Sequence, residues 1–233
     1  MTTNNGSALG IRLGVLGAGS MGSSIARGLV EAGVIAGTDV HACDHHAEKL
    51  AALADECSIQ THAGAREVLA ADPDVVVLAV KPQVLGRLLD DVAALLAGRL
   101  VVSIAAGVTL STLEGRLSES RVVRVMPNLP VSVRSGASAI TGGPSASAED
   151  VELVRRMFAA LGSAQVMRED QLDAEGAVVG CAPAYFALMV DALTRAGIRS
   201  GLPAGAAREM VNATMLGVAR SLEVSGEHPR AYM

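Results

Sequence analysis

The 233-residue sequence is poor in aromatic residues: it has no tryptophan, two tyrosines and two phenylalanines, although half of its residues are apolar. Alanine, valine and leucine must therefore fill the core, which excludes aromatic-rich folds. The scarcity also removes the usual platforms on which single-stranded bases stack. Because 19 basic residues stand against 24 acidic ones, no basic surplus is available to neutralise a phosphate backbone. We therefore expect no nucleic-acid partner.

Cysteines and long apolar runs are also sparse. Cys43, Cys57 and Cys181 are widely spaced and lack both a CxxC pair and a nearby grid of histidines. This pattern fits a reducing cytoplasm and small buried hydrophobic residues, not a disulfide framework or a metal site. No uninterrupted run of about 18 apolar residues is present, and the amino terminus lacks the positive segment of a secretory signal. We expect a soluble, cytoplasmic protein that does not associate with membranes.

The length predicts one large domain with a smaller one attached. Residues 1–10 are polar and are expected to form a mobile leader. Beyond them, short β-branched runs alternate with helical patterns: strands are expected at 11–16, 39–43, 75–80, 100–104 and 122–125, and helices at 20–32, 47–54 and 82–96. The run at 75–80 is apolar throughout, as in a parallel strand buried on both faces. The alternation predicts an α/β fold with a Rossmann-like, doubly wound and mostly parallel sheet at 11–168.

The pattern changes after residue 144. A helix at 148–161 and a short strand at 164–167 are followed by two long helical stretches, 170–199 and 203–225, so we expect an all-helical domain at 169–233. Such a domain is too small to bury its apolar faces alone. It is therefore expected to pack against another subunit.

The segment 17–22 reads GAGSMG, directly after the first expected strand and at the start of a helix. In this setting Gly17 permits a tight turn, Gly19 lets a pyrophosphate approach the backbone, and Gly22 permits close packing of helix on strand. The N–H groups and the helix dipole then hold the phosphate charge. We assign to cofactor binding the whole turn: Leu16, Gly17, Ala18, Gly19, Ser20, Met21 and Gly22.

Asp44 ends the second expected strand, close to the roughly 20-residue spacing of the carboxylate that binds an adenosine ribose. A carboxylate there would repel a 2′-phosphate, so NADH is slightly favoured over NADPH. His45 and His46 follow at once and, if charged, would soften that repulsion. Cofactor choice thus stays open between NADH and NADPH.

Two further strand ends carry small residues toward the same edge. Ala79, Val80, Lys81 and Pro82 follow the strand at 75–80, and we assign them to the cofactor crevice with Lys81 as a charge at its rim. The alternative is that Pro82 merely starts a helix and Lys81 is a surface charge. Ala105, in the small-residue turn 103–107, is expected to complete the nicotinamide pocket.

Asn128 stands between two prolines in the segment MPNLP (residues 126–130). A rigid frame would orient its amide toward a substrate or a nicotinamide; alternatively, the side chain bonds its own turn. The segment GCAPAY (residues 180–185) interrupts a long helical stretch. Pro183 removes one helical hydrogen bond and frees a carbonyl group, so a kink or helix start is expected there. Such a break either admits a small ligand or only joins two packed helices.

Together GAGSMG, AVKPQ (79–83), MPN and the GCAPAY helix start resemble pyrroline-5-carboxylate reductases, in order and spacing over nearly the whole chain. The resemblance implies hydride transfer from NADH or NADPH to the C=N bond of a small cyclic imine acid, with 1-pyrroline-5-carboxylate reduced to L-proline. It also implies a homodimer formed by interlocking helices, and further assembly into rings of dimers. A protonated imine is already an electrophile, so we assign no catalytic acid or base. The residues assigned to the substrate are Asn128, Leu129, Cys181 and Ala182.

The sequence departs from the family pattern at three places. Leu129 replaces the threonine of the family's MPNTP, and Ala182 replaces a glycine of its GSGPAY. The family continues after its G-x-H-P segment, here residues 226–229, into a Ser-Pro-Gly-Gly-Thr-Thr loop, which this sequence does not reach before Met233. A shortened chain, a different imine, or a non-catalytic cofactor-binding dimer that acts as a sensor or partner subunit would each explain this. A β-hydroxyacid dehydrogenase is disfavoured, because residues 170–190 contain no lysine to face the substrate.

Overall fold

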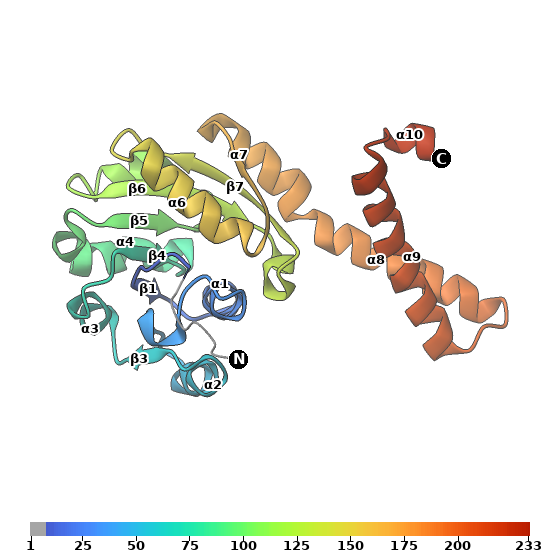
Figure 1. Cartoon of the computed structure of the whole chain (residues 1–233), viewed down its shortest axis with the longest axis horizontal. Coiled ribbons are helices and arrows are strands. Elements are labelled where there is room, and N and C mark those ends of the chain that lie inside the picture. Colours follow the sequence, from blue (N-terminus) through green and yellow to red (C-terminus); the bar gives the residue numbers. More distant parts are fainter. Residues whose placement is uncertain (1–7) are drawn as a thin grey trace. The chain divides into compact units, whose positions relative to one another are not determined.

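The computed structural model describes residues 8–233. The chain divides into two compact units, one that ends at Gly180 and one that comprises Cys181–Met233. The first unit holds a single eight-stranded sheet with helices packed around it (Figure 1). Within the described residues, the second unit is entirely helical outside its connecting turns.

The strands of the sheet lie in the order β3-β2-β1-β4-β5-β6-β7-β8. All neighbouring strands are parallel except β6 and β7, which pair antiparallel with Val125 opposite Ile140. Chain reversal at one end of an otherwise parallel sheet is common in doubly wound folds. The strand bounds are β1 (Leu13–Leu16), β2 (Val40–Cys43), β3 (Gln60–His62), β4 (Val75–Leu78), β5 (Leu100–Ser103), β6 (Arg121–Pro127), β7 (Gly136–Gly142) and β8 (Gly162–Val166).

Helices cover both faces of this sheet. On one face α1, α2 and α6 pack over side chains such as Val15 and Val77, and on the other α3, α4 and α5 pack over Leu16 and Leu78. β1 and β4 are buried throughout, which explains their continuous apolar runs. The helix bounds in this unit are α1 (Ser20–Glu31), α2 (Ala47–Cys57), α3 (Ala65–Ala70), α4 (Pro82–Val92), α5 (Leu110–Glu114), α6 (Ala148–Ala159) and α7 (Glu169–Glu175). Short 3₁₀ turns η1 (Gly37–Asp39), η2 (Ala93–Leu96) and η3 (Leu129–Val133) and a π-turn, η4 (Gly176–Gly180), complete it.

The predicted fold class is confirmed, and the expected strands and helices are present with their ends moved by a few residues. Two strands were missed. β3 is only three residues long and partly exposed, while β7 reads GASAITG, whose small residues and glycine ends conceal a strand. The predicted leader 1–10 falls largely on residues 1–7, which lie outside the described residues. At its end, the N–H groups of Ala8 and Leu9 donate to the carbonyls of Gly33 and Val34, so these two residues are held to the unit.

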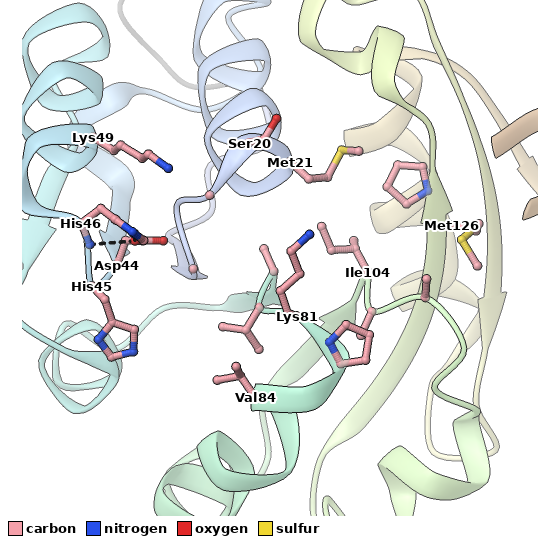
Figure 2. Close-up of a pocket in the computed structure, with 18 residues that line it drawn as sticks. Ser20, Met21, Asp44, His45, His46, Lys49, Lys81, Val84, Ile104 and Met126 are labelled. Carbon is pink, nitrogen blue, oxygen red and sulfur yellow. Dashed lines mark hydrogen bonds and ion pairs between the residues drawn. The ribbon is translucent and has the colours of Figure 1, made fainter. Parts of the chain in front are cut away.

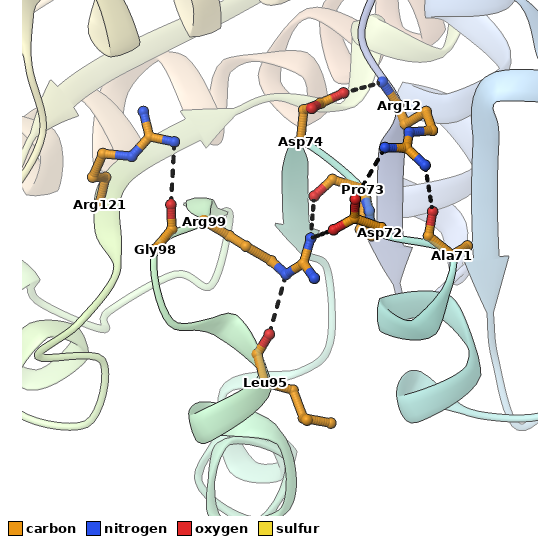
Figure 3. Close-up of polar contacts among 9 residues, drawn as sticks. All are labelled: Arg12, Ala71, Asp72, Pro73, Asp74, Leu95, Gly98, Arg99 and Arg121. Atoms are coloured by element: carbon orange, nitrogen blue, oxygen red, sulfur yellow. Dashed lines mark hydrogen bonds and ion pairs between the residues drawn. The ribbon is translucent and has the colours of Figure 1, made fainter.

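An ion-pair network joins the amino ends of the central strands (Figure 3). Asp72, in the turn before β4, bridges Arg12 before β1 and Arg99 before β5, at 3.1 Å and 2.9 Å. The Arg12 side chain also donates to the carbonyl of Ala71, and the Arg99 side chain donates to that of Pro73. Asp72 adopts a φ of +55°, in the left-handed region that aspartate tolerates better than most residues. These contacts lie at the edge opposite to the carboxyl ends of the strands.

The second unit consists of α8 (Ala182–Arg199), α9 (Ala204–Ser225) and α10 (Pro229–Tyr232), with α8 packed against α9. Many of its large apolar side chains are exposed: Tyr185, Phe186, Leu188, Met189, Leu193, Ile198, Leu202, Met210, Leu216, Val218 and Val224. Within the described residues, the stretch Glu169–Arg199 is long and apolar enough to cross a membrane by length and composition alone. This stretch holds no uninterrupted run of about 18 apolar residues, and it meets the test because its mean hydropathy stays high despite a few polar residues.

The two compact units divide after Gly180, whereas the sequence pattern predicts the boundary at 168/169. The difference concerns α7 and η4. They pack against β6 and β7, and thus count with the sheet.

Candidate cofactor cleft

A cleft of about 710 Å³ opens at the carboxyl ends of β1, β2, β4, β5 and β6. In Figure 2, Asp44, His45, His46 and Lys49 lie on one side, Ile104 and Met126 on the other, and Lys81 between them. This is where ligands bind in open α/β sheets, because the loops at the carboxyl edge diverge from the point at which the strand order reverses. The lining residues are Gly17, Gly19, Ser20, Met21, Asp44, His45, His46, Lys49, Ala79, Val80, Lys81, Pro82, Val84, Ile104, Ala105, Ala106, Met126 and Pro127.

The turn between β1 and α1 needs each of its three glycines for a different reason. Gly17 has a φ of +103°, and a Cβ there would lie 2.9 Å from the carbonyl oxygen of Ala79. A Cβ on Gly22 would overlap the carbonyl oxygen of Gly17. A Cβ on Gly19 would meet no atom within 4 Å, so that residue borders open space. The first and third glycines therefore shape the turn, and the second leaves room for a ligand.

Helix α1 begins at this turn without a side-chain cap, since Gly19 occupies the N-cap position. Its first N–H groups have no intrahelical acceptors, and the helix dipole adds positive potential. The N–H of Gly17 donates to the carbonyl of Cys43, and that of Ala79 donates to the carbonyl of Leu16. These bonds tie three strand ends together. The arrangement suits the pyrophosphate of a dinucleotide.

Asp44 is held rigidly at the end of β2, with 11% of its side chain exposed. Its Oδ1 accepts from the backbone N–H of His46 at 2.9 Å and lies 2.8 Å from His46 Nδ1. Burial raises the pKa of Asp44, but the hydrogen bonds and charge of His46 and the N–H of Ala18 outweigh it, so the pKa lies below its ordinary value. Asp44 therefore presents an ionised carboxylate to the cleft at neutral pH.

Lys81 stands at the N-cap of α4, and Pro82 takes the first position of that helix. Lys81 is exposed, and both residues line the cleft. The two alternatives are therefore compatible, because these residues both start a helix and lie at the cleft. Across the cleft, Ala105 is buried and Ala106 exposed. The N–H of Ile104 donates to the carbonyl of Leu78, which joins this loop to the end of β4.

The structure brings ten of the predicted cofactor residues into one cleft: Gly17, Gly19, Ser20, Met21, Asp44, Ala79, Val80, Lys81, Pro82 and Ala105. Leu16, Ala18 and Gly22 are buried beside it and do not line it. Lys49 and Val84 line the cleft and were missed. Lys49 lies in the first turn of α2, the helix that follows Asp44.

The four predicted substrate residues do not line this cleft. Asn128 is 8% exposed, and its Oδ1 accepts from the N–H of Ala137 at 2.8 Å while Nδ2 donates to the carbonyl of Val179 at 3.3 Å. Leu129, on η3, is 60% exposed. Cys181 is exposed and Ala182 partly buried, both at the start of the second unit.

A buried arginine lies near the cleft, on β6. Arg124 is 2% exposed and pairs with Glu169 at 3.2 Å and with Asp173 at 3.5 Å, both on α7. Glu169 also accepts from the N–H of Leu110 at the start of α5. Nearby on α7, burial raises the pKa of the Glu175 carboxyl. Among residues 8–233, no group of three or more histidine, cysteine, aspartate or glutamate side chains is placed to hold a metal ion.

Comparison with known proteins gives concordant results for both units. A family model described as "NADP oxidoreductase coenzyme F420-dependent" matches residues 12–107, and one described as "Pyrroline-5-carboxylate reductase dimerisation" matches residues 169–233. A pyrroline-5-carboxylate reductase of Pseudomonas aeruginosa is 40% identical over 212 residues, which cover 90% of this chain and 77% of that protein.

Solved structures agree. A pyrroline-5-carboxylate reductase of Coxiella burnetii superposes with a TM-score of 0.86 at 31% identity, covering 94% of this chain and 82% of that one. A pyrroline carboxylate reductase of Plasmodium falciparum with NADP bound gives a TM-score of 0.83 at 27% identity, covering 92% of this chain and 79% of that one.

Proposed function

This chain belongs to the pyrroline-5-carboxylate reductase family, and we propose that it reduces 1-pyrroline-5-carboxylate to L-proline with NAD(P)H. It is an oxidoreductase that acts on a C=N bond. The observation that carries this assignment is the 40% identity over 212 residues, which extends through both the cofactor cleft and the helical region.

The residues of the cleft fit a dinucleotide. Bound there, the reduced nicotinamide supplies the hydride. The open space beside Gly19 and the uncapped N–H groups of α1 receive the pyrophosphate, while Asp44 accepts hydrogen bonds from ribose hydroxyls. Ala105, Ala106 and Met126 form the far side, where small and apolar surfaces exclude water around the nicotinamide ring.

The substrate needs orientation more than acid–base help, since a protonated imine is already electrophilic. For its binding we propose the segment at Asn128 and Leu129 together with Cys181 and Ala182, with Asn128 acting through its two hydrogen bonds and not by direct contact. We assign no catalytic acid or base. We further propose that residues 11–168 act as the dinucleotide-binding domain and 169–233 as the dimerisation and substrate domain.

We propose a slight preference for NADH over NADPH. Its support is the ionised, firmly held carboxylate of Asp44, which would repel a 2′-phosphate. Lys49, His45 and His46 line the same part of the cleft, and their positive charge would act in the opposite direction. The preference is therefore expected to be small and to shift toward NADPH when the histidines are protonated.

The match of residues 169–233 to a dimerisation domain indicates a homo-oligomer. We propose a homodimer that assembles further into a ring of dimers. The exposed apolar side chains of α8 and α9 support this, because a surface so rich in large apolar residues is unusual on a monomer. Burial between subunits also accounts for the apolar stretch Glu169–Arg199 without a membrane. We propose a cytoplasmic location, as expected for a soluble biosynthetic enzyme.

The test is oxidation of NADH and of NADPH by the purified protein, followed with 1-pyrroline-5-carboxylate and with its six-membered homologue. The expected result is turnover of the five-membered imine with both nucleotides and a modest advantage for NADH. Nucleotide binding without turnover of any cyclic imine would overturn the reductase assignment and leave a cofactor-binding dimer. A marked NADPH preference would overturn the role given to Asp44.

A further inference from the structure

The π-turn η4 is followed by a proline that changes its hydrogen bonding. In an α-helix the carbonyl of Val179 would accept from the backbone N–H of residue 183, four positions on. Residue 183 is proline and has no N–H. Pro183 therefore leaves the Val179 carbonyl without its regular helical donor, close to the point where the first unit ends and the second begins.

A side chain from a distant part of the sequence donates to that carbonyl instead. Nδ2 of Asn128 donates to the Val179 carbonyl at 3.3 Å, across 51 positions of sequence. The orientation of the amide is unambiguous, because its other end accepts from the N–H of Ala137 at 2.8 Å and must be oxygen. Asn128 is 8% exposed, so both hydrogen bonds are shielded from water.

Arg124 and Met126 on β6, and Asn128 directly after it, approach the consecutive elements α7 and η4. Arg124 pairs with Glu169 and Asp173. A Cβ placed on Gly176 would lie 3.6 Å from the Cε atom of Met126, so the Met126 side chain packs close to the start of η4. Asn128 then bonds Val179. Met126 and Pro127, the two residues before Asn128, also line the cofactor cleft. One short segment therefore forms a cleft wall and anchors the π-turn.

We propose that Asn128 is a positioning residue. Its amide holds the π-turn Gly176–Gly180 against the cleft wall by donating to the Val179 carbonyl, which lacks its helical donor because residue 183 is proline. Resting on the proposed reductase function, this anchors the turn from which the chain continues into Cys181 and Ala182, the residues proposed for the substrate. Asn128 thus acts through Val179. Its amide sets where the imine acid is held relative to the hydride donor.

The first test is Asn128→Asp. One carboxylate oxygen still accepts from Ala137, but the other can donate to Val179 only when protonated and repels that carbonyl when ionised. The kcat/KM for the imine acid, taken as a ratio to wild type at each pH, is expected to be about tenfold lower at pH 8 and to recover toward pH 5. The KM for NADH should change less than twofold. The charged groups on β6 and on the helix packed against it are Arg124, Glu169, Asp173 and Glu175, and the ratio to wild type cancels any pH effect common to both proteins.

Asn128→Ala is the matched comparison, because it loses both hydrogen bonds at every pH. Its ratio to wild type is expected to be low and flat. Amide exchange of residues 176–182 gives a readout independent of turnover, and exchange should be faster in both variants, with pH dependence beyond that of wild type only in the aspartate variant.

Pro183→Ala supplies the decisive control. It restores an N–H that is able to donate to the Val179 carbonyl, so in the Asn128→Ala background it should recover most of the lost kcat/KM and slow the exchange of 176–182. If Asn128 instead contacted the substrate directly, Pro183→Ala would recover neither, and the proposal would be overturned. A flat pH ratio for Asn128→Asp would overturn it as well. If wild type itself turns over no cyclic imine, the reductase function fails, and the exchange measurements still decide the role of Asn128.

Discussion

The carboxylate of Asp44 is fixed by its neighbour His46, whose backbone N–H and ring Nδ1 both lie within 2.9 Å of the same oxygen, Oδ1. One carboxylate oxygen is thereby oriented in a residue that lines the cleft. An oxygen held in this way would lose little freedom on accepting from ribose hydroxyls, which supports the role in cofactor choice proposed for Asp44.

The first prediction concerns Asp44→Asn. The substitution keeps the size of the side chain and removes its charge, so kcat/KM with NADH should fall about 10- to 100-fold, as expected for a hydrogen bond to a charged group worth roughly 1.5–3 kcal/mol. With NADPH the value should stay within threefold or rise, because repulsion of the 2′-phosphate is relieved. Steady-state kinetics with both nucleotides checks this. Asp55→Asn, exposed on α2 and outside the cleft, is the control and should change neither value; an equal loss with both nucleotides would contradict the role of Asp44.

The second prediction separates two glycines of the same turn. Gly22→Ala places a Cβ into the carbonyl of Gly17, so the free energy of unfolding should fall by about 1–3 kcal/mol. Gly19→Ala meets no protein atom and should leave the thermal midpoint within a degree or two, yet weaken NADH binding at least tenfold, because the added methyl group occupies the pyrophosphate space. Thermal unfolding and calorimetric titration measure the two effects. Unchanged NADH affinity in Gly19→Ala would place the pyrophosphate elsewhere.

The third prediction concerns pH and the bridge made by Asp72. Hydrogen bonds and charge from Arg99, and then the charge of Arg12, lower the pKa of Asp72 below its ordinary value of 3.8. A carboxyl with a lowered folded-state pKa adds stability above that ordinary value, and the contribution disappears as pH falls through the lower, folded-state pKa. Asp72→Asn, which also tolerates the left-handed backbone, should therefore lower the thermal midpoint at pH 7 but not at pH 2–3. A deficit that persists unchanged in acid would show that the ion pairs contribute nothing.

The fourth prediction concerns assembly. Leu216, on α9, is 73% exposed in the single chain, and Leu216→Glu should yield a smaller species because a charge buried between subunits is costly. Val133, on η3, is 71% exposed and provides a matched control, since it lies outside the dimerisation region. Val133→Glu should leave the mass unchanged. Light scattering after size-exclusion chromatography distinguishes the two, and an unchanged mass for Leu216→Glu would move the interface away from that part of α9.

The sheet was predictable where burial makes a strand apolar on both faces, as in Val75–Leu78, and where glycine spacing marks a turn, as at 17–22. β7 was not, because its side chains are small and its pairing with β6 depends on a chain reversal that no local propensity encodes. Strand ends were overestimated for a similar reason. Ala79 and Val80 look like strand residues, but they leave the sheet to form the cleft.

The cleft was predictable to the extent that strand ends converge at one edge, which places Asp44, Lys81 and Ala105 together. Lys49 was missed because a lysine in the first turn of a helix resembles any solvated charge. The contacts of Asn128 were also beyond reach. Its partner Val179 lies 51 positions away in the sequence. Only the fold shows that Asn128 donates to the same carbonyl that Pro183 leaves without a helical donor.

The one antiparallel pairing among the described strands, between β6 and β7, decides where the chain leaves the sheet. With β7 reversed and β8 parallel to it, β8 ends beside Ile140, away from the cofactor edge, and α7 then runs back alongside β6 from the level of Arg124 to that of Asn128. Had β7 been parallel like its predecessors, the helix after β8 would have travelled in the opposite direction and delivered Gly180 to the far edge. The number of reversals in the sheet therefore decides at which edge the chain emerges: one reversal returns it to the edge where the cofactor cleft opens. Any further reversals beyond β6 would have to come in pairs to keep this outcome, whereas a parallel strand such as β8 leaves it unchanged.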